Sequence, residues 1–299
     1  MTSIQQTILV TDASGPLGRR VVELLLDRKV GTVLAGSRDL DGLSDLAKAG
    51  AVLRKVDFDD PPEALAAAFA GVERLLLSSV DADEPVGQRF EQHERAIRAA
   101  VAASVKHVTY TSIAHPDPES PVMTAPDHRR TEEALAKSGI PFTALRNNLY
   151  MENLLPFLRP AVVQGQLFGS AGETGAAYVS REDCAQAAAS AVTMVPTGNA
   201  TLEVTGPSVV NYTQLARLVS ELTGERVTHV PLKGEDRRAE LIGAGISLSN
   251  ADTLVSFDAG MLLGKFGPAT AVVRQLTGRA PTSVREFLLS NKKALSADA

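Results

Sequence analysis

The chain has 299 residues, of which 44% are hydrophobic and 22% are charged, and its formal net charge at pH 7 is −5. This length suits one large α/β domain or a domain with a smaller lobe, and the acidic balance gives no indication of nucleic-acid binding. One cysteine, Cys184, excludes an internal disulfide and a multi-cysteine zinc site and suits a reducing cytoplasm. We expect no signal peptide and no membrane span, because polar residues interrupt the N-terminal stretch and no apolar run is long enough.

The first predicted element is a strand, a tight turn and a helix. Ile8–Val10 is typical of a buried parallel strand, and Leu17–Arg28 has apolar residues at helical spacing. In such a turn, glycines let the backbone approach a pyrophosphate, and the helix N-terminus supplies amide donors and positive potential. The predicted cofactor-binding residues of the turn are Ala13, Ser14, Gly15, Pro16, Leu17 and Gly18.

Asp12 breaks the glycine spacing of this turn. In the pattern Gly-x-x-Gly-x-x-Gly, Gly15 and Gly18 hold the second and third positions, but Asp12 holds the first. Aspartate accepts a positive φ less readily than glycine, and its carboxylate repels pyrophosphate unless it is paired or turned away. Pro16 also removes one N–H, although its fixed φ suits the first helical position. Two interpretations stay open: Asp12 points to solvent or caps the helix and the cofactor still binds, or cofactor use is lost or altered.

The rest of the first half alternates between strands and helices. Further strands are predicted at Thr32–Ala35, Val52–Lys55, Arg74–Leu77, His107–Tyr110 and Phe142–Leu145. Helices are predicted between them at Asp41–Ala49, Glu63–Ala70, Glu91–Ala103 and His128–Ser138. The pattern predicts a Rossmann-like α/β domain over residues 1–150, with a doubly wound parallel sheet covered by helices on both faces.

The rhythm changes after Arg146. The predicted elements are helices at Met151–Val163, Asp183–Val195 and from Tyr212 onward, a Gly-rich stretch at Gly165–Gly175, a strand at Thr201–Val204 that joins the sheet edge, a lone strand at Val227–Pro231 and a frayed tail at 296–299. We therefore expect residues 176–205 to return to the dinucleotide-binding domain. Residues 151–175 and 206–299 are expected to form a smaller, discontinuous α/β substrate lobe over the C-terminal ends of the strands.

Polar residues follow the predicted strands in turn. Arg38 follows the second strand, where an acidic residue binds a free ribose 2′-hydroxyl and an arginine pairs with a 2′-phosphate. Arg38 therefore favours NADP(H) over NAD(H), although the adjacent Asp39 weakens the case and a solvated surface arginine is the alternative. The other strand ends outline one crevice that runs from adenine to nicotinamide: Asp57, Phe58, Ser78, Ser79, Thr111 and Ser112.

Candidate catalytic residues lie around Ser112. The Tyr-x-x-x-Lys pair of short-chain dehydrogenases is absent from the helix that follows it, which carries His128 instead. His128 either titrates near neutrality as an acid, base or orienting donor, or is a surface histidine in a charged helix start. Tyr150 either places a phenol near a substrate oxygen or is a core tyrosine with a satisfied hydroxyl. No metal-ligand cluster and no Gly-x-Ser-x-Gly elbow is present, so we predict no metal.

Three segments resemble the NmrA-like atypical short-chain dehydrogenases/reductases: Thr11–Gly18, Val105–Ser112 and Ser138–Asn147. Within that family the chain is most similar to type 2 NAD(P)H:quinone oxidoreductases and triphenylmethane reductases, over almost its whole length. The resemblance implies a Rossmann lobe with a small substrate lobe, a monomer or homodimer, and no Tyr-x-x-x-Lys pair. It also implies that Asn147 and Tyr150 lie in the loop that lines the nicotinamide pocket, and that His128 matches the quinone-reductase branch.

The activity implied by this resemblance is NADPH-dependent hydride transfer to a quinone-like or other conjugated aromatic substrate. Such a transfer needs little acid catalysis, so positioning of the cofactor beside a flat apolar pocket would supply most of the acceleration. Ser112, His128 and Tyr150 are the residues we expect to orient or protonate the substrate. The alternatives are a non-catalytic dinucleotide sensor, or cofactor-free chemistry, because Asp12 replaces the first motif glycine.

Overall fold

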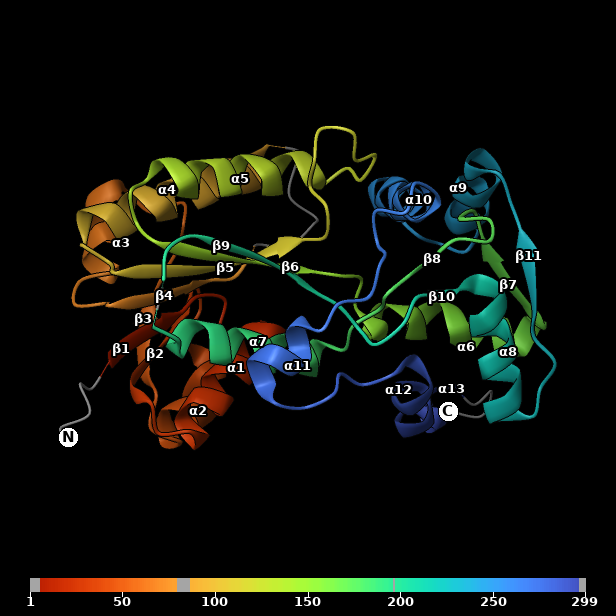
Figure 1. Cartoon of the computed structure of the whole chain (residues 1–299), viewed down its shortest axis with the longest axis horizontal. Helices are drawn as coiled ribbons and strands as arrows, with labels where there is room; N and C mark the ends of the chain where they lie inside the picture. The colour runs from red at the N-terminus through yellow and green to blue at the C-terminus, as the bar shows by residue number, and fades with distance from the viewer. Residues whose placement is uncertain (1–5, 80–86, 196, 296–299) are drawn as a thin grey trace.

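Two regions lie side by side along the long axis of the molecule (Figure 1). The computed structural model describes residues 6–79, 87–195 and 197–295, so the predicted tail at 296–299 lies outside the described residues. One region is built on a large twisted sheet, and the other is mainly helical with short strands. The sequence predicts the cofactor crevice at the C-terminal ends of the strands, with the second region lying over them.

The sheet has seven parallel strands in the order β3-β2-β1-β4-β5-β6-β9. The strands are β1 (Gln6–Val10), β2 (Gly31–Ser37), β3 (Val52–Lys55), β4 (Arg74–Leu77), β5 (His107–Ile113), β6 (Phe142–Asn147) and β9 (Ala200–Val204). The order reverses between β1 and β4, which is the switch point at which doubly wound folds bind ligands. The predicted fold class is confirmed, and the strand predicted at Thr201–Val204 does pair with β6 at the edge.

Helices cover both faces of the sheet because the strands are apolar on both faces. Along β1, Ile8 and Val10 belong to the core under one helical layer, and Leu9 belongs to the core under the other. The first layer holds α1 (Pro16–Asp27), α7 (Arg181–Thr193) and α11 (Val272–Thr277), and the second holds α3 (Pro62–Ala68), α4 (Gln88–Ala102) and α5 (Ala125–Lys137). A short turn η1 (Asp41–Leu43) and α2 (Ser44–Lys48) follow β2.

The second region packs around its own apolar core. Its elements are η2 (Met151–Leu154), α6 (Leu155–Gln164), β7 (Gln166–Gly169), β8 (Gly175–Ala176), β10 (Val210–Asn211), α8 (Tyr212–Thr223), β11 (Thr228–Pro231), α9 (Gly234–Gly243), α10 (Leu248–Leu262), α12 (Val284–Ser290) and α13 (Lys292–Leu295). The prediction of a lone strand at Val227–Pro231 is wrong, because β11 pairs in parallel with β7. The Gly-rich stretch, for which no element is predicted, supplies β7 and the start of β8, and the helix predicted at Met151–Val163 is divided into η2 and α6.

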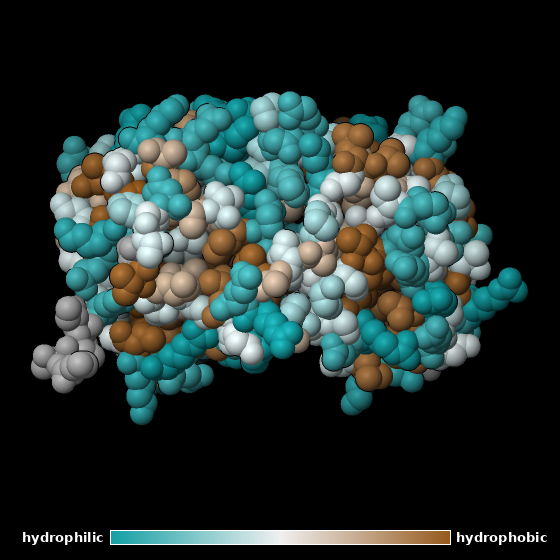
Figure 2. All heavy atoms as spheres, viewed as in Figure 1, coloured by the Kyte–Doolittle hydropathy of each residue, from teal (hydrophilic) through white to brown (hydrophobic). Residues whose placement is uncertain are grey.

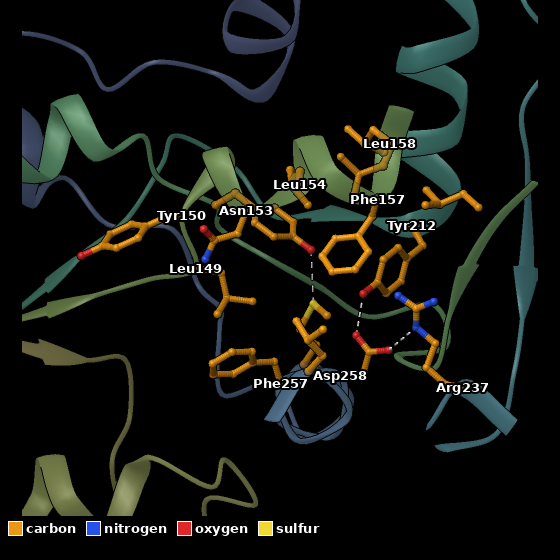
Figure 3. Close-up of a pocket in the computed structure, with 15 residues that line it drawn as sticks. Leu149, Tyr150, Asn153, Leu154, Phe157, Leu158, Tyr212, Arg237, Phe257 and Asp258 are labelled. Atoms are coloured by element: carbon orange, nitrogen blue, oxygen red, sulfur yellow. Dashed lines mark hydrogen bonds and ion pairs between the residues drawn. The ribbon is translucent and has the colours of Figure 1, made fainter. Parts of the chain in front are cut away.

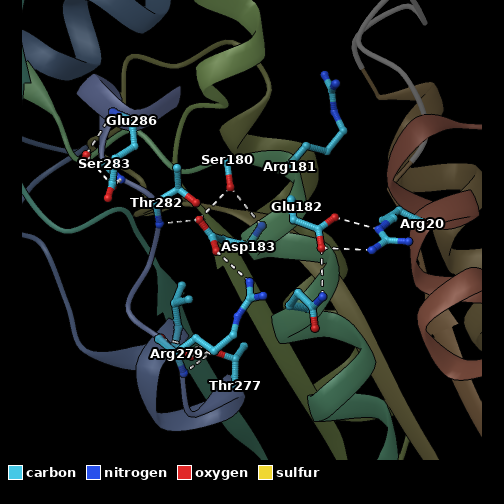
Figure 4. Close-up of polar contacts among 12 residues, drawn as sticks. Arg20, Ser180, Arg181, Glu182, Asp183, Thr277, Arg279, Thr282, Ser283 and Glu286 are labelled. Carbon is cyan, nitrogen blue, oxygen red and sulfur yellow. Dashed lines mark hydrogen bonds and ion pairs between the residues drawn. The ribbon is translucent and has the colours of Figure 1, made fainter. Parts of the chain in front are cut away.

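One late segment packs away from the second region. Val273 of α11 lies in the same core as α1 and α7, beneath the large sheet. The start of α7 also binds the segment that follows α11, because the buried Asp183 carboxylate accepts hydrogen bonds from the Thr282 amide at 2.8 Å and from the Ser180 hydroxyl at 2.6 Å (Figure 4). The division of the chain into domains stays a prediction, and part of 206–299 packs against the sheet-bearing region.

The face shown in Figure 2 carries small groups of hydrophobic side chains separated by hydrophilic ones. Isolated exposed apolar residues of this kind, such as Val163 on α6, are normal for a folded chain. None of the helices in the described ranges is long and apolar enough to cross a membrane.

Candidate active site

Two hollows open along the C-terminal edge of the sheet and meet at Asp12. The first, about 190 Å³, lies beyond β1, β2 and β3, and we call it the first hollow. The second hollow, about 300 Å³, lies beyond β4, β5 and β6 and reaches into the second region. Asp12 lines both of them. The two hollows together form one elongated crevice across the switch point of the sheet, the position expected for an extended ligand.

The turn after β1 keeps the backbone geometry of the glycine motif. Asp12 has a φ of 55°, the left-handed conformation in which aspartate is tolerated better than most residues. A Cβ atom on Gly18 would lie 2.2 Å from the Asp12 carbonyl oxygen, and one on Gly15 would lie 2.2 Å from the Asp12 carboxylate. The carboxylate therefore lies against Gly15, at the junction of the two hollows.

The first hollow brings together residues predicted from three strand ends. Ser14, Arg38, Asp57 and Phe58 all line it, as the sequence predicts. Arg38 is exposed at its edge, whereas Phe58 is buried. Sequence reasoning missed Gln92 of α4, which donates to Asp59 at 2.8 Å; its buried Oε1 has no partner among the described residues.

The second hollow collects most of the remaining predicted residues. Its lining includes Pro16, Leu17, Ser78, Ser79, Ser112, His128, Asn147 and Tyr150. Four predicted cofactor-binding residues line neither hollow and shape the wall instead: Ala13, Gly15, Gly18 and Thr111. Thr111, for example, accepts a hydrogen bond from the Ser79 amide at 2.8 Å and so holds the end of β4 in place.

His128 is a buried, neutral member of the second hollow. It is 6% exposed, and its Nδ1 lies 2.7 Å from the hydroxyl of Tyr110. Burial lowers the pKa of His128 well below its usual value, and the positive charge of Arg89 and the adjacent His93 lower it further. The interpretation of His128 as a surface histidine is therefore wrong, and burial favours a neutral imidazole over one that titrates near neutrality. A role as an orienting donor stays a prediction.

Ser112 is tied into an ionic network. Its hydroxyl donates to Glu132 at 2.7 Å, and Glu132 also forms an ion pair with Arg146 at 2.7 Å. Arg146 in turn pairs with Glu203 of β9 at 3.2 Å. The Ser112 hydroxyl proton is thus directed toward Glu132, and the hydroxyl oxygen is left as an acceptor in the hollow.

Tyr150 and Asn147 form a second fixed pair. Asn147 donates from Nδ2 to the Tyr150 hydroxyl at 3.0 Å, and burial raises the pKa of Tyr150, so it stays a phenol. The guanidinium of Arg181 lies 5.4 Å from the centre of the Tyr150 ring. The buried Oδ1 of Asn147 has no hydrogen-bond partner in the described part of the chain. The pair therefore offers an unused acceptor.

An apolar cavity continues from the second hollow into the second region (Figure 3). Leu149, Tyr150, Asn153 and Phe257 line both spaces. The cavity walls include Leu154, Phe157, Leu158, Leu215 and Met261. At its far end Tyr212 donates to Asp258 at 2.5 Å, and Arg237 approaches the same carboxylate at 4.0 Å. The Tyr150 hydroxyl points away from this cavity, so its phenol faces Asn147 rather than the apolar space.

Arg89 is a site residue that the sequence prediction missed, although the helix around it carries a signal. It lies on α4, is 4% exposed and lines the second hollow. It shares a helix face with His93, Ile97 and Ala100, all of which are buried. An arginine at helical spacing with such residues is expected to point toward the core. By contrast, the cavity residues come from η2, α6, α8, α9 and α10, and no local motif connects them.

Residues that could hold a metal are not grouped in the described ranges: no three His, Cys, Asp or Glu side chains lie close enough together. Cys184 is buried in α7, and burial raises the pKa of its thiol well above the usual value. Burial in the core therefore disfavours the reactive thiolate form of Cys184.

The fold and the crevice define a class of protein, the dinucleotide-type α/β proteins with an apolar cavity at one end of the ligand crevice. Within that class, the chain matches the NmrA-like family over residues 4–288, and it belongs to that family. The resemblance predicted from three short segments is confirmed. The chain is an oxidoreductase of the NmrA-like family.

Relatives with known names are similar over nearly the whole chain. Quinone oxidoreductase 2 of Escherichia coli (strain K12) is 36% identical over 280 residues, which are 93% of this chain and 96% of the relative. The structure of the NADPH-dependent quinone oxidoreductase of Escherichia coli with NADPH gives a TM-score of 0.90 at 36% identity, covering 96% of this chain and 99% of that one. The triphenylmethane reductase of Citrobacter sp. with NADP(H) gives 0.88 at 31% identity, covering 96% and 100%.

Proposed function

We propose that this protein is an NADPH-dependent reductase that transfers a hydride to a quinone or a related conjugated aromatic compound. One observation carries the proposal: a single crevice has Arg38 at one end, the glycine turn in the middle and an apolar cavity at the other end. A cation, the N-terminus of a helix and an apolar space are what the 2′-phosphate, the pyrophosphate and an aromatic substrate need, in that order.

The cofactor is NADPH, and the residues present fit it. Two buried acceptors line the crevice without a partner among the described residues, Gln92 Oε1 in the first hollow and Asn147 Oδ1 in the second. The adenine amino group and the nicotinamide carboxamide each carry N–H donors of the kind that such acceptors require. When bound, NADPH supplies the hydride.

Different crevice residues would bind different parts of the cofactor. Ser14, Arg38, Asp57 and Phe58 would hold the adenosine and its 2′-phosphate. The start of α1 at Pro16 and Leu17, with the supporting residues Ala13, Gly15 and Gly18, would face the pyrophosphate. Ser78, Ser79 and Asn147 would bind the nicotinamide end, with Thr111 behind them. Ser112, His128 and Tyr150 would orient the substrate.

The apolar cavity favours a flat, conjugated substrate. Leu149 and Phe257 line both the cavity and the second hollow, so an aromatic substrate in the cavity would lie next to the proposed nicotinamide position. A quinone accepts a hydride with little help from an acid because its reduced anion is already delocalised. Positioning would then account for most of the rate increase. We further propose that the protein acts in the cytoplasm as a monomer or homodimer.

Calorimetric titration with NADPH and NADH, followed by NADPH oxidation with a panel of benzoquinones and naphthoquinones, tests the proposal. We expect tight binding of NADPH only and turnover of at least one quinone. Leu154→Phe, which fills the cavity, should abolish quinone turnover while NADPH still binds, and Val163→Phe on the exposed side of α6 is the matched control. Binding of NADPH without turnover of any quinone or azo dye would contradict the reductase and favour a dinucleotide sensor.

A further inference from the structure

A buried phenol lies directly behind His128. Tyr110 of β5 is fully buried, and its hydroxyl lies 2.7 Å from His128 Nδ1. The ring centres are 5.9 Å apart. Because strand side chains alternate, Tyr110 points toward α4 and α5 while its neighbour Thr109 points toward the other face of the sheet. His128 connects Tyr110 to the crevice, because it hydrogen-bonds the Tyr110 hydroxyl and also lines the second hollow.

The surroundings of this pair keep both groups uncharged. Arg89 and His93 face it from α4, and Asp127 and Glu132 face it from α5. Burial raises the pKa of Tyr110 above its usual range, so the phenol keeps its proton. The neighbouring Thr131 hydroxyl contacts Tyr110 and partly offsets this rise in its pKa. It donates to the Asp127 carbonyl oxygen at 2.7 Å and lies 3.0 Å from Nδ1 of His93.

We infer that Tyr110 is a positioning residue: its hydroxyl donates to Nδ1 and thereby holds His128 in the tautomer with the proton on Nε2. Nε2 then presents an N–H to the second hollow, which His128 lines. His128 acts there as a hydrogen-bond donor to the substrate oxygen. This inference rests on the proposed function, because that oxygen belongs to the proposed quinone.

The donor role fits the charge balance of quinone reduction. One hydride from NADPH converts the quinone to the hydroquinone monoanion and leaves NADP⁺. A preorganised N–H beside the oxygen stabilises the charge that develops there. A neutral imidazole keeps its N–H proton, since losing it would form an imidazolate, so the proton that completes the hydroquinone comes from water.

The tautomer can be measured without any substrate. Long-range proton–nitrogen NMR spectra of the full chain labelled with nitrogen-15 report which ring nitrogen carries the proton. The chain has five histidines, and His128→Gln assigns the signal. We expect the Nε2–H tautomer, uncharged from about pH 6 to 9, and a mixture of tautomers in Tyr110→Phe. Thr109→Val is the matched control, because it removes a buried hydroxyl of the same strand that has no described partner.

Kinetics then test the consequence for catalysis. Tyr110→Phe should lower kcat about tenfold with the Kd for NADPH unchanged, whereas Thr109→Val should alter neither. A charged or Nδ1-protonated His128 in the wild type, an unchanged tautomer in Tyr110→Phe, or a changed tautomer with wild-type kcat each overturns the inference. A wild type with the expected tautomer that turns over no quinone overturns the proposed function instead, and leaves the Tyr110–His128 hydrogen bond established.

Discussion

The first and second hollows meet at Asp12 but are built in different ways. In the first, Ser14, Arg38 and Asp39 are exposed, and Arg38 stands at the edge on a long side chain. In the second, Ser112, His128 and Asn147 are buried, and each is held by a hydrogen bond to Glu132, Tyr110 or Tyr150.

The difference separates binding from chemistry. Exposed side chains lose conformational entropy only when a ligand orders them, so substitutions in the first hollow should alter cofactor affinity. Hydrogen-bonded groups in a buried wall are already oriented, so changes in the second hollow should appear in stability and in kcat. Each of the following variants tests one side of this contrast.

Glu132→Ala should have the largest effect. It removes the partner shared by Ser112 and Arg146. The side chains of the ion pair are mostly buried, at 25% exposed for Arg146 and 12% for Glu132. Breaking one side of such a mostly buried pair should lower the free energy of unfolding by about 2–3 kcal/mol. Urea denaturation measures this change.

The neighbouring Glu133→Ala is the control for Glu132→Ala. Glu133 pairs with Arg129 on the exposed side of the same helix, so its loss should cost under about 0.5 kcal/mol. Equal losses in the two variants would mean that the wall of the second hollow is no more tightly held than the surface.

Arg38→Ala should act on affinity alone. Loss of a charged hydrogen bond to the 2′-phosphate should weaken NADPH by about 1.5–3 kcal/mol, while NADH binding and the free energy of unfolding stay unchanged. Calorimetry with both nucleotides measures the difference, and Arg98→Ala, on the exposed side of α4, is the control. An equal loss of NADPH and NADH affinity would refute the role of Arg38.

The strands and the turn could be predicted because their signals are local. Each central strand buries both faces and therefore reads as a short apolar run, and the glycine turn repeats a spacing that its backbone geometry requires. Asp12, which replaces the first glycine of that spacing, adopts the positive φ that glycine would favour there.

The apolar cavity and the state of His128 could not be predicted from local patterns. The start of α5 is rich in charged residues and resembles a solvated face, yet packing against α4 and β5 buries His128. The pairing of β7 with β11 joins segments separated by α8, and a short apolar run carries no information about its partner. Tertiary contacts decide the cavity, the burial of His128 and this strand pairing, and the local patterns of one sequence do not reveal such contacts.

Asp12 lies at the boundary between the hollows, and Asp12→Gly should have a smaller effect on NADPH affinity. Removing a left-handed non-glycine residue and a carboxylate near the pyrophosphate should tighten NADPH by about 1 kcal/mol. Asp12→Asn keeps the side-chain shape and removes the charge, so comparing the two by calorimetry separates repulsion from backbone strain. Unchanged affinity in both variants would mean that the carboxylate turns away when the cofactor binds.

The Arg20–Glu182 ion pair lies outside both hollows and gives the smallest effect. The two groups are 2.7 Å apart, and their side chains are 38% and 41% exposed. The hydrogen bond from Arg20 lowers the pKa of Glu182 below the usual 4.5. The pair therefore stabilises the fold fully above that value, and this contribution is lost as the pH falls through the lowered pKa.

Glu182→Gln should reduce the free energy of unfolding by under about 1 kcal/mol at pH 7 and leave it unchanged in acid. Calorimetric melting at neutral pH and at about pH 3 measures both values, with the exposed Glu225→Gln as control. A loss at neutral pH as large as that of Glu132→Ala would show that exposure does not decide how firmly an ionic contact holds this fold. Exposure would then not explain why the two hollows differ, although it is the main difference between Arg38 in the first hollow and Glu132 behind the second.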